Sequence, residues 1–297
     1  MNPYARHSLL KIQRAMRALG YVVSGLLLSS CAHQYVEQLS QVSANAMIHH
    51  VPTANGVQEC RELMAADITS TGAELDSSNI RLLNWNIQKQ RNTDSTNDLR
   101  DLADGKDLIL IQEASLREET INDVDSSKHW SFAPGYLLDG EVTGVMTLSS
   151  IKPLTQCSFV TLEPILRSPK ATSITEYALS DTDLTLAVVN MHVVNFSLGL
   201  KAFREQIDNV HHVLETHNGP VILSGDFNTW RRQRMLLLEQ MTEKLGLNPV
   251  DFGDDKRVRL MGNLLDHLYV RGLSATDAST EAVITSDHNP MSATLAM

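Results

Sequence analysis

The sequence predicts an α/β fold in which two β-sheets pack together and helices cover their outer faces. Short runs rich in Val, Ile, Leu and Thr recur from Ile80 onward, as expected for strands. Helical periodicity separates only some of these runs, so strands outnumber helices. The 297 residues, 42% of them hydrophobic, are enough to bury the core of one large domain.

The first 31 residues resemble a signal sequence that ends in a lipidation site. Four basic and no acidic residues accompany an apolar run, 18–30, which is too short to cross a bilayer but fits a signal peptide. The run ends in Leu28-Ser-Ser-Cys31, which resembles the lipobox of bacterial lipoproteins. We therefore expect Cys31 to be lipidated and to anchor the protein in the bacterial cell envelope, facing the periplasm. The alternative is a helical extension, or a chain starting at Met16 or Met47. Loss of the leader would imply a cytoplasmic protein.

The charge of the chain argues against tight, nonspecific binding of nucleic acid. The formal net charge is −10, and removing residues 1–30 takes away four basic side chains and leaves −14. Nonspecific binding to nucleic acid needs Lys and Arg to displace counterions, so an acidic body disfavours a processive DNA enzyme. A local basic patch remains compatible with this balance.

Residues 32–79 are polar, with turns at 52–56 and 71–72, and we interpret them as a loosely packed lead-in to a domain at 80–297. Cys60 and Cys157 fit either a disulfide or two buried thiols. Helices are expected at 200–215 and 231–245, because turn residues follow both. Strands are expected at 80–87, 107–111, 144–149, 171–179, 184–192, 221–224, 265–270 and 291–296.

Six short motifs place metal- or phosphate-binding groups at or near the ends of predicted strands. A phosphodiester is anionic and repels nucleophiles, so its cleavage needs a divalent cation, donors for the developing charge, and a base. The motifs supply all three and predict one hydrolytic site. They are Asn84-Trp-Asn-Ile87, Ile111-Gln-Glu113, Asn190-Met-His192, Gly225-Asp-Phe-Asn228, Leu265-Asp-His267 and Ser286-Asp-His-Asn-Pro290.

In order and spacing, these motifs resemble the endonuclease/exonuclease/phosphatase superfamily, the fold of DNase I, neutral sphingomyelinases and inositol-polyphosphate phosphatases. The resemblance covers 80–297, and the motifs at 225–228 and 286–290 are its most specific part. Three stretches, 144–149, 189–199 and 219–230, are similar to the bacterial YafD-like branch, which implies the fold but no substrate. The resemblance implies a DNase I-like four-layer sandwich of two mixed sheets. It also implies a phosphoesterase that uses Mg²⁺ or Mn²⁺.

Chemistry and the resemblance together suggest roles for the oxygen-bearing residues. Glu113 is a carboxylate that suits a hard cation such as Mg²⁺, and the resemblance adds Asn86 and Asp287 as metal-side residues. Asp226 would orient or deprotonate the attacking water, and Asn228 would donate to a phosphoryl oxygen. An Asx-turn is the ordinary alternative for this Asp-x-Asn sequence.

The histidines divide into catalytic and structural candidates. The resemblance makes His288 the base or the stabiliser of the transition state, with Asp266 accepting from it and fixing its tautomer. It makes His192 a second imidazole facing the phosphate, with Asn190 beside it as a substrate-binding residue. His267 is expected on the opposite face of its strand.

The sequence also predicts a substrate-binding cluster after the motif at 225–228. Trp230, Arg231, Arg232 and Arg234 combine an indole with three cations, which could bind extra phosphates or stack a base. Cations at a helix N-terminus oppose the helix dipole, which favours a functional interpretation. The alternative is the solvated first turn of a helix.

Two classes of function follow from these observations. The first is a metal-dependent phosphoesterase: a nuclease, or a hydrolase of a phospholipid or small phosphoester. The second is a catalytically idle phosphate- or lipid-binding protein on the same scaffold. We favour the enzyme because the metal carboxylate and the terminal histidine are both present. Acidity and the lipid anchor favour a lipid or small substrate, and the arginine cluster favours a nucleic acid. No protein partner is inferred.

Overall fold

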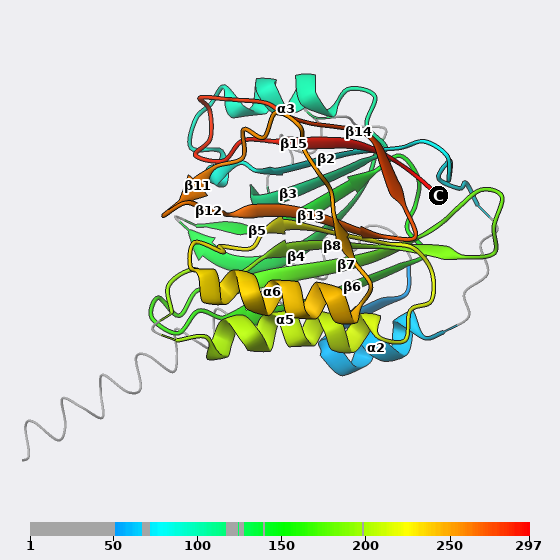
Figure 1. Cartoon of the computed structure of the whole chain (residues 1–297), viewed down its shortest axis with the longest axis horizontal. Helices are drawn as coiled ribbons and strands as arrows, with labels where there is room; N and C mark the ends of the chain where they lie inside the picture. Colours follow the sequence, from blue (N-terminus) through cyan, green and yellow to red (C-terminus); the bar gives the residue numbers. More distant parts are fainter. Residues whose placement is uncertain (1–50, 67–71, 117–123, 125–127, 139, 198) are drawn as a thin grey trace, which may run out of the picture. The chain divides into compact units, whose positions relative to one another are not determined.

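The computed structural model describes residues 51–66, 72–116, 124, 128–138, 140–197 and 199–297. The predicted leader with Cys31, and residues 32–50, lie outside this part of the chain. The described residues form two packed, mixed β-sheets with helices on their outer faces (Figure 1). This is the four-layer arrangement that the sequence predicts. Among the described residues, no helix has the length and apolar character of a membrane span.

The larger sheet has seven strands. In spatial order they are β1 (Thr53–Asn55), β6 (Thr155–Leu162), β7 (Pro169–Ala178), β8 (Thr185–His192), β9 (Val221–Asp226), β13 (Asp266–Arg271) and β10 (Asn248–Pro249). The pairs β1–β6 and β8–β9 are parallel, and the other pairs are antiparallel. The parallel β8–β9 pair brings the carboxyl ends of two strands to the same edge of the sheet.

The smaller sheet has six strands, and a separate ribbon has two. In the sheet the order is β14 (Ser274–Thr280), β15 (Met291–Ala296), β2 (Ile80–Asn86), β3 (Leu108–Ser115), β5 (Glu141–Ser149) and β4 (His129–Leu138). Only β2 and β3 are parallel. The ribbon consists of β11 (Arg259–Leu260) and β12 (Asn263–Leu264). It precedes β13, which brings Asp266 to the site.

The side chains of β8 alternate between two separate layers of the core. Leu186 and Val188 face the smaller sheet and join the core between the sheets. Ala187 and Val189 point the other way, into a core shared with the helices. Because side chains alternate along a strand, a strand covered on both faces reads as a continuous apolar run. All four side chains are at most 1% exposed.

The helices cover the outer faces of both sheets. The α2 (Val57–Met64), α5 (Lys201–Leu214) and α6 (Arg232–Lys244) helices lie over the seven-stranded sheet, and α3 (Ser95–Ala103) lies over the six-stranded one (Figure 1). A short 3-10 helix, η1 (Gln88–Gln90), follows β2. The helices predicted at 200–215 and 231–245 are confirmed as α5 and α6. On α5, Phe203, Ile207 and Val210 form one buried stripe.

Part of the segment interpreted as a loose lead-in is instead packed against the sheet. Strand β1 pairs with β6, and the Cys60 and Met64 side chains of α2 are buried in the helix-side core. Tertiary packing, rather than the polar local sequence, decides the structure of this segment. Cys60 and Cys157 are both buried free thiols. The domain boundary at residue 80 stays a prediction.

Candidate active site

Three neighbouring strands of the larger sheet place a row of candidate site residues at one edge. His192 ends β8 and is in register with Asp226 at the end of β9, which is in register with Asp266 at the start of β13. All three are at most 4% exposed. Gly225 permits this close pairing, because a Cβ there would lie 2.0 Å from the carbonyl oxygen of Met191. Strand register therefore assembles residues that are far apart in sequence.

The smaller sheet supplies an amide and a carboxylate to the same place. Asn86 ends β2, and its Nδ2 donates to Asp226 Oδ2 at 3.0 Å. Glu113 has a φ of 53° and sits at a bulge in the β3–β5 pairing. A bulge redirects one side chain out of the regular alternation. Glu113 contacts the Lys89 ammonium, and its Oε1 lies 3.7 Å from His192 Nε2.

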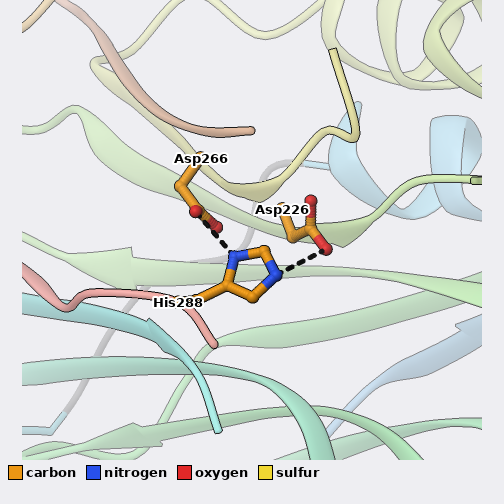
Figure 2. A group of neighbouring side chains, drawn as sticks. All are labelled: Asp226, Asp266 and His288. Carbon is orange, nitrogen blue, oxygen red and sulfur yellow. Dashed lines mark hydrogen bonds and ion pairs between the residues drawn. The ribbon is translucent and has the colours of Figure 1, made fainter. Parts of the chain in front are cut away.

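His288 comes from a loop that hydrogen bonds hold against β2. The Trp85 indole donates to the carbonyl oxygen of His288 at 2.9 Å, and the Ser286 hydroxyl donates to that of Asn86 at 2.7 Å. Figure 2 shows the imidazole between two carboxylates. Its Nδ1 lies 2.7 Å from Asp266 Oδ2, and its Nε2 lies 3.9 Å from Asp226 Oδ2. The predicted pairing of Asp266 with His288 is present in the structure.

The two imidazoles have opposite electrostatic surroundings. Burial alone would lower the pKa of His288, but the Asp266 and Asp226 carboxylates outweigh it and raise the pKa to about 10. Burial, together with the Lys170 and Lys89 ammonium groups, holds the pKa of His192 well below its ordinary value. His288 is therefore a cation at neutral pH, and His192 is a neutral imidazole.

The Asp226 carboxyl group has a raised pKa. Burial raises its pKa to about 6, and the nearby His288 cation opposes that rise. The Asn228 backbone N–H donates to Asp226 Oδ1 at 2.9 Å, which is the Asx-turn weighed as the alternative. Asn228 Nδ2 donates to Asp226 at 3.2 Å and to the carbonyl oxygen of Val193 at 3.0 Å. Both amide hydrogens are thus engaged, so Asn228 positions Asp226 here instead of presenting a free donor to a phosphoryl oxygen.

A cleft of about 430 Å³ opens onto these residues. Its lining includes Asn86, Glu113, His192, Asp226, Asn228, Asp287 and His288, all predicted from the sequence. It also includes Lys89, Tyr136 and Lys170, which the sequence did not single out. Lys170 is buried, and its Nζ lies 2.9 Å from His192 Nε2. Burial lowers the pKa of Lys170, while Glu113 acts in the opposite direction.

Two residues predicted to bind substrate are structural instead. Asn190 is fully buried between the sheets, accepts from Gln112 Nε2 at 2.7 Å and donates to the carbonyl oxygen of Met146 at 2.9 Å. Arg234 is 1% exposed, and its guanidinium donates to the carbonyl oxygens of Val194, Asn228 and Asn195 and to the Ser197 hydroxyl. Neither side chain has a free face for a ligand.

The rest of the predicted substrate cluster lies at the surface. The guanidinium of Arg231 lies 4.1 Å from the centre of the Trp230 ring, and Arg232 is exposed. The Trp230 indole donates to Asn195 Oδ1 at 2.9 Å. In the described part of the chain, the cleft lining includes none of these three residues. His267 faces away, as predicted, and its Nε2 lies 2.7 Å from the Thr229 hydroxyl.

The donor set at the site fits a hard divalent cation. Glu113, Asp287 and Asn86 offer carboxylate and amide oxygens at the cleft, and such ligands suit Mg²⁺. Asp226, Asp266 and His288 also lie close enough together to hold an ion. We prefer the first set because the Nδ1 atom of His288 already pairs with Asp266, and Mg²⁺ favours oxygen over imidazole.

The fold and the site define the class of protein. Residues 83–288 match the model of the Endonuclease/Exonuclease/phosphatase family, and the chain belongs to this family. It is 39% identical over 224 residues to a UPF0294 protein of Yersinia enterocolitica, covering 74% of this chain and 85% of the relative. It is 40% identical over 213 residues to a UPF0294 protein of Klebsiella pneumoniae, covering 71% and 80%. These relatives are YafD-like, which confirms the predicted branch.

Solved structures share the fold at low sequence identity. An endonuclease/exonuclease/phosphatase of Beutenbergia cavernae gives a TM-score of 0.58 at 13% identity, covering 74% of this chain and 72% of that chain. The human Nocturnin catalytic domain with bound sulfate anion gives 0.55 at 13% identity, covering 76% and 96%. These likenesses show the fold alone.

Proposed function

We propose that this protein is a metal-dependent phosphoesterase. The observation that carries the proposal is that His192, Asp226, Glu113 and His288 line one cleft. Asp266, the third residue of the strand-end row, pairs with His288 behind it. Family membership supports a hydrolase of phosphate esters.

The geometry suggests a division of labour among the side chains. Asp226, with a pKa raised to about 6, accepts a proton from the attacking water at Oδ2. The His288 cation faces the same atom at 3.9 Å and stabilises negative charge developing on the phosphoryl group. Its raised pKa favours this role over that of a base. Asp266 holds the ring and its charge in place.

Other residues that line the cleft support further positive charge, through a bound metal and through Lys170. Glu113, Asn86 and Asp287 would hold Mg²⁺ or Mn²⁺, which supplies charge neutralisation to the phosphoryl group when bound. Lys170 contributes a buried ammonium beside His192, and both lie in the cleft lining. Neutral His192 can donate or accept a hydrogen bond without adding a second charge beside Lys170.

A substrate panel tests the proposed function. Plasmid DNA, single-stranded DNA, phospholipid vesicles, inositol phosphates and bis-p-nitrophenyl phosphate are each incubated with Mg²⁺, with Mn²⁺ and with EDTA. We expect hydrolysis of at least one phosphoester that EDTA abolishes and added metal restores. Binding of these ligands without turnover under any metal condition would favour the idle binding protein.

We also propose that the native chain is exported and lipidated. The basic flank, short apolar run and Leu28-Ser-Ser-Cys31 sequence support this location. We expect cleavage before Cys31, acylation of its thiol, and retention of an uncleaved, unlipidated precursor in Cys31→Ser. Mass spectrometry of the native protein decides the question, since an unmodified Cys31 within an intact N-terminal peptide would return the enzyme to the cytoplasm.

A further inference from the structure

Exposed apolar side chains lie on three loops, each of which contributes one of them to the lining of the cleft. Leu162, Ile165 and Leu166 lie at the β6–β7 turn, Phe196 follows β8, and Leu260 and Met261 form the tip of the β11–β12 ribbon. We call these six residues the apolar rim. Leu166 and Phe196, which are 59% and 53% exposed, line the cleft together with Leu260. Exposed apolar groups that gather around one site mark an interaction surface.

A buried carboxylate fixes two of the loops that carry the rim. Glu163 is 1% exposed, and its Oε1 accepts from the backbone N–H groups of Asn195 and Phe196 at 2.6 and 2.7 Å. Its Oε2 accepts from the Ser168 hydroxyl at 2.8 Å. These bonds join the β6–β7 turn to the loop after β8. The backbone that carries Leu166 and Phe196 is therefore held in place by Glu163, while both side chains remain exposed.

Polar contacts also fasten the remaining rim loop. Asn263 Nδ2 in β12 donates to the carbonyl oxygen of Trp230 at 3.0 Å, which ties the ribbon to the segment after β9. Arg234 holds the loop after β8 from its other side, at the carbonyl oxygen of Asn195. All three rim loops are thus anchored by polar groups beneath them while their apolar tips face outward.

Cationic groups accompany the rim. Arg167 is exposed next to Leu166, and Arg91 is exposed at the lining of the cleft. Arg259 precedes Leu260, with about half of its side chain exposed, and its guanidinium pairs with Asp255 at 3.0 Å. Apolar side chains interleaved with Arg suit a membrane interface, where the apolar groups enter the boundary of the acyl chains and the cations meet phosphate headgroups.

We propose that the apolar rim docks on a phospholipid surface, so that the cleft receives a phosphoester presented by that surface. This inference rests on the proposed phosphoesterase function and narrows its substrate class to phospholipid headgroups. A nucleic-acid surface fits the same features less well, because the rim has only one aromatic ring, Phe196, on which a base could stack.

The test compares two double variants in the full-length chain. Ile165→Ser with Met261→Ser changes two rim residues that do not line the cleft, and these residues are 51% and 77% exposed. Leu184→Ser with Ile284→Ser is the matched control, since both residues are exposed apolar positions that also lie outside the cleft lining. Both proteins keep residues 1–31, so any membrane affinity of that segment is common to them.

Binding is measured by flotation with vesicles of phosphatidylethanolamine and phosphatidylglycerol in EDTA, where turnover is not needed. We expect the rim variant to partition about tenfold more weakly than wild type, from the loss of two partly inserted apolar side chains. The control variant should partition like wild type. Equal partitioning of all three proteins would overturn the proposal, and so would a rim variant that loses affinity for single-stranded DNA but not for vesicles. If the double variant does not fold, Met261→Ser alone serves, with Ile284→Ser as its control.

Turnover is a separate readout, on vesicle phospholipid and on soluble bis-p-nitrophenyl phosphate with Mg²⁺. The proposal predicts that the rim variant loses activity on vesicles and keeps activity on the soluble diester. If wild type binds vesicles through the rim but hydrolyses no phosphoester, the proposed function fails and the docking surface stands. If wild type hydrolyses the soluble diester but vesicles bind independently of the rim, the docking proposal alone fails.

Discussion

Removing the carboxylate of Asp266 should reduce turnover because His288 loses the partner that stabilises its charge and orients its ring. The His288 pKa of about 10 lies above the ordinary value of 6.5, which corresponds to an imidazolium favoured by on the order of 4–5 kcal/mol. Three carboxylates, Asp266, Asp226 and Asp287, raise the pKa, and the largest of these contributions comes from Asp266 in its buried 2.7 Å contact. In Asp266→Asn, an amide replaces the charge that stabilises the imidazolium and orients the ring. We expect kcat to fall by roughly 10²–10³.

A double-mutant cycle distinguishes this dependence from an independent role. If Asp266 acts only through His288, Asp266→Asn combined with His288→Ala should lose no more than about tenfold beyond His288→Ala alone, because linked catalytic residues are not additive. Independent roles would multiply the two losses, to roughly 10⁴ or more. The assay is steady-state hydrolysis of bis-p-nitrophenyl phosphate, with exposed Asp183→Asn as the matched control. Fully multiplicative losses would refute the linkage.

Three further predictions concern buried charge. Arg234→Met should lower the free energy of unfolding by about 3 kcal/mol or more, because four acceptors lose their donor. Denaturant titration measures this loss. The control, Arg232→Met at an exposed position, should lower the free energy of unfolding by less than about 0.5 kcal/mol. Lys89→Met should lower the Mg²⁺ concentration that gives half-maximal activity, because the ammonium no longer competes for Glu113; an unchanged or higher requirement would contradict this. His267 is held neutral, since burial lowers its pKa to about 3. Its stabilising contribution is therefore complete above pH 6.5 and is lost as the pH falls toward 3, by up to roughly 1.4 kcal/mol per pH unit. In unfolding titrations at several pH values, the free energy of unfolding should fall less steeply with pH for His267→Phe than for wild type. Equal slopes in the two proteins would contradict this prediction.

Most buried strands were predictable from the sequence, whereas the edge strands and the interior strand β6 were not. β8 and β9 are covered on both faces, so they appear as continuous apolar runs. β14 is mostly exposed at the edge of the smaller sheet, and its Ser-Ala-Thr-Asp sequence carries no apolar pattern. β4 contains Pro134 and Gly135, where a bulge accommodates them, and those residues conceal the strand.

Motif spacing predicted which residues meet at the cleft but not the direction of every side chain. The row of His192, Asp226 and Asp266 follows from strand ends that meet at one edge. Adjacency in the sequence groups Arg234 with its neighbours Arg231 and Arg232, although Arg234 is buried and the two neighbours are exposed.

A helical-stripe reading would have separated Arg234 from those neighbours. It shares the buried face of α6 with Leu237, Leu238 and Met241, at the spacing of one helical stripe. Lys89 and Lys170 offered no comparable signal, because a single lysine near a strand end is ordinarily solvated. Only the packing of the two sheets brings them to the cleft.

The most direct test of the central claim is the Mg²⁺ dependence of bis-p-nitrophenyl phosphate hydrolysis in wild type and Glu113→Gln. The substitution keeps the size and hydrogen-bonding capacity of the side chain but removes the charge that binds a hard cation. We predict metal-dependent turnover in wild type and a loss of about 10² or more in the variant, with an unchanged free energy of unfolding within about 1 kcal/mol. Equal Mg²⁺-dependent rates in the two proteins would contradict the assignment of Glu113 and of the metal site.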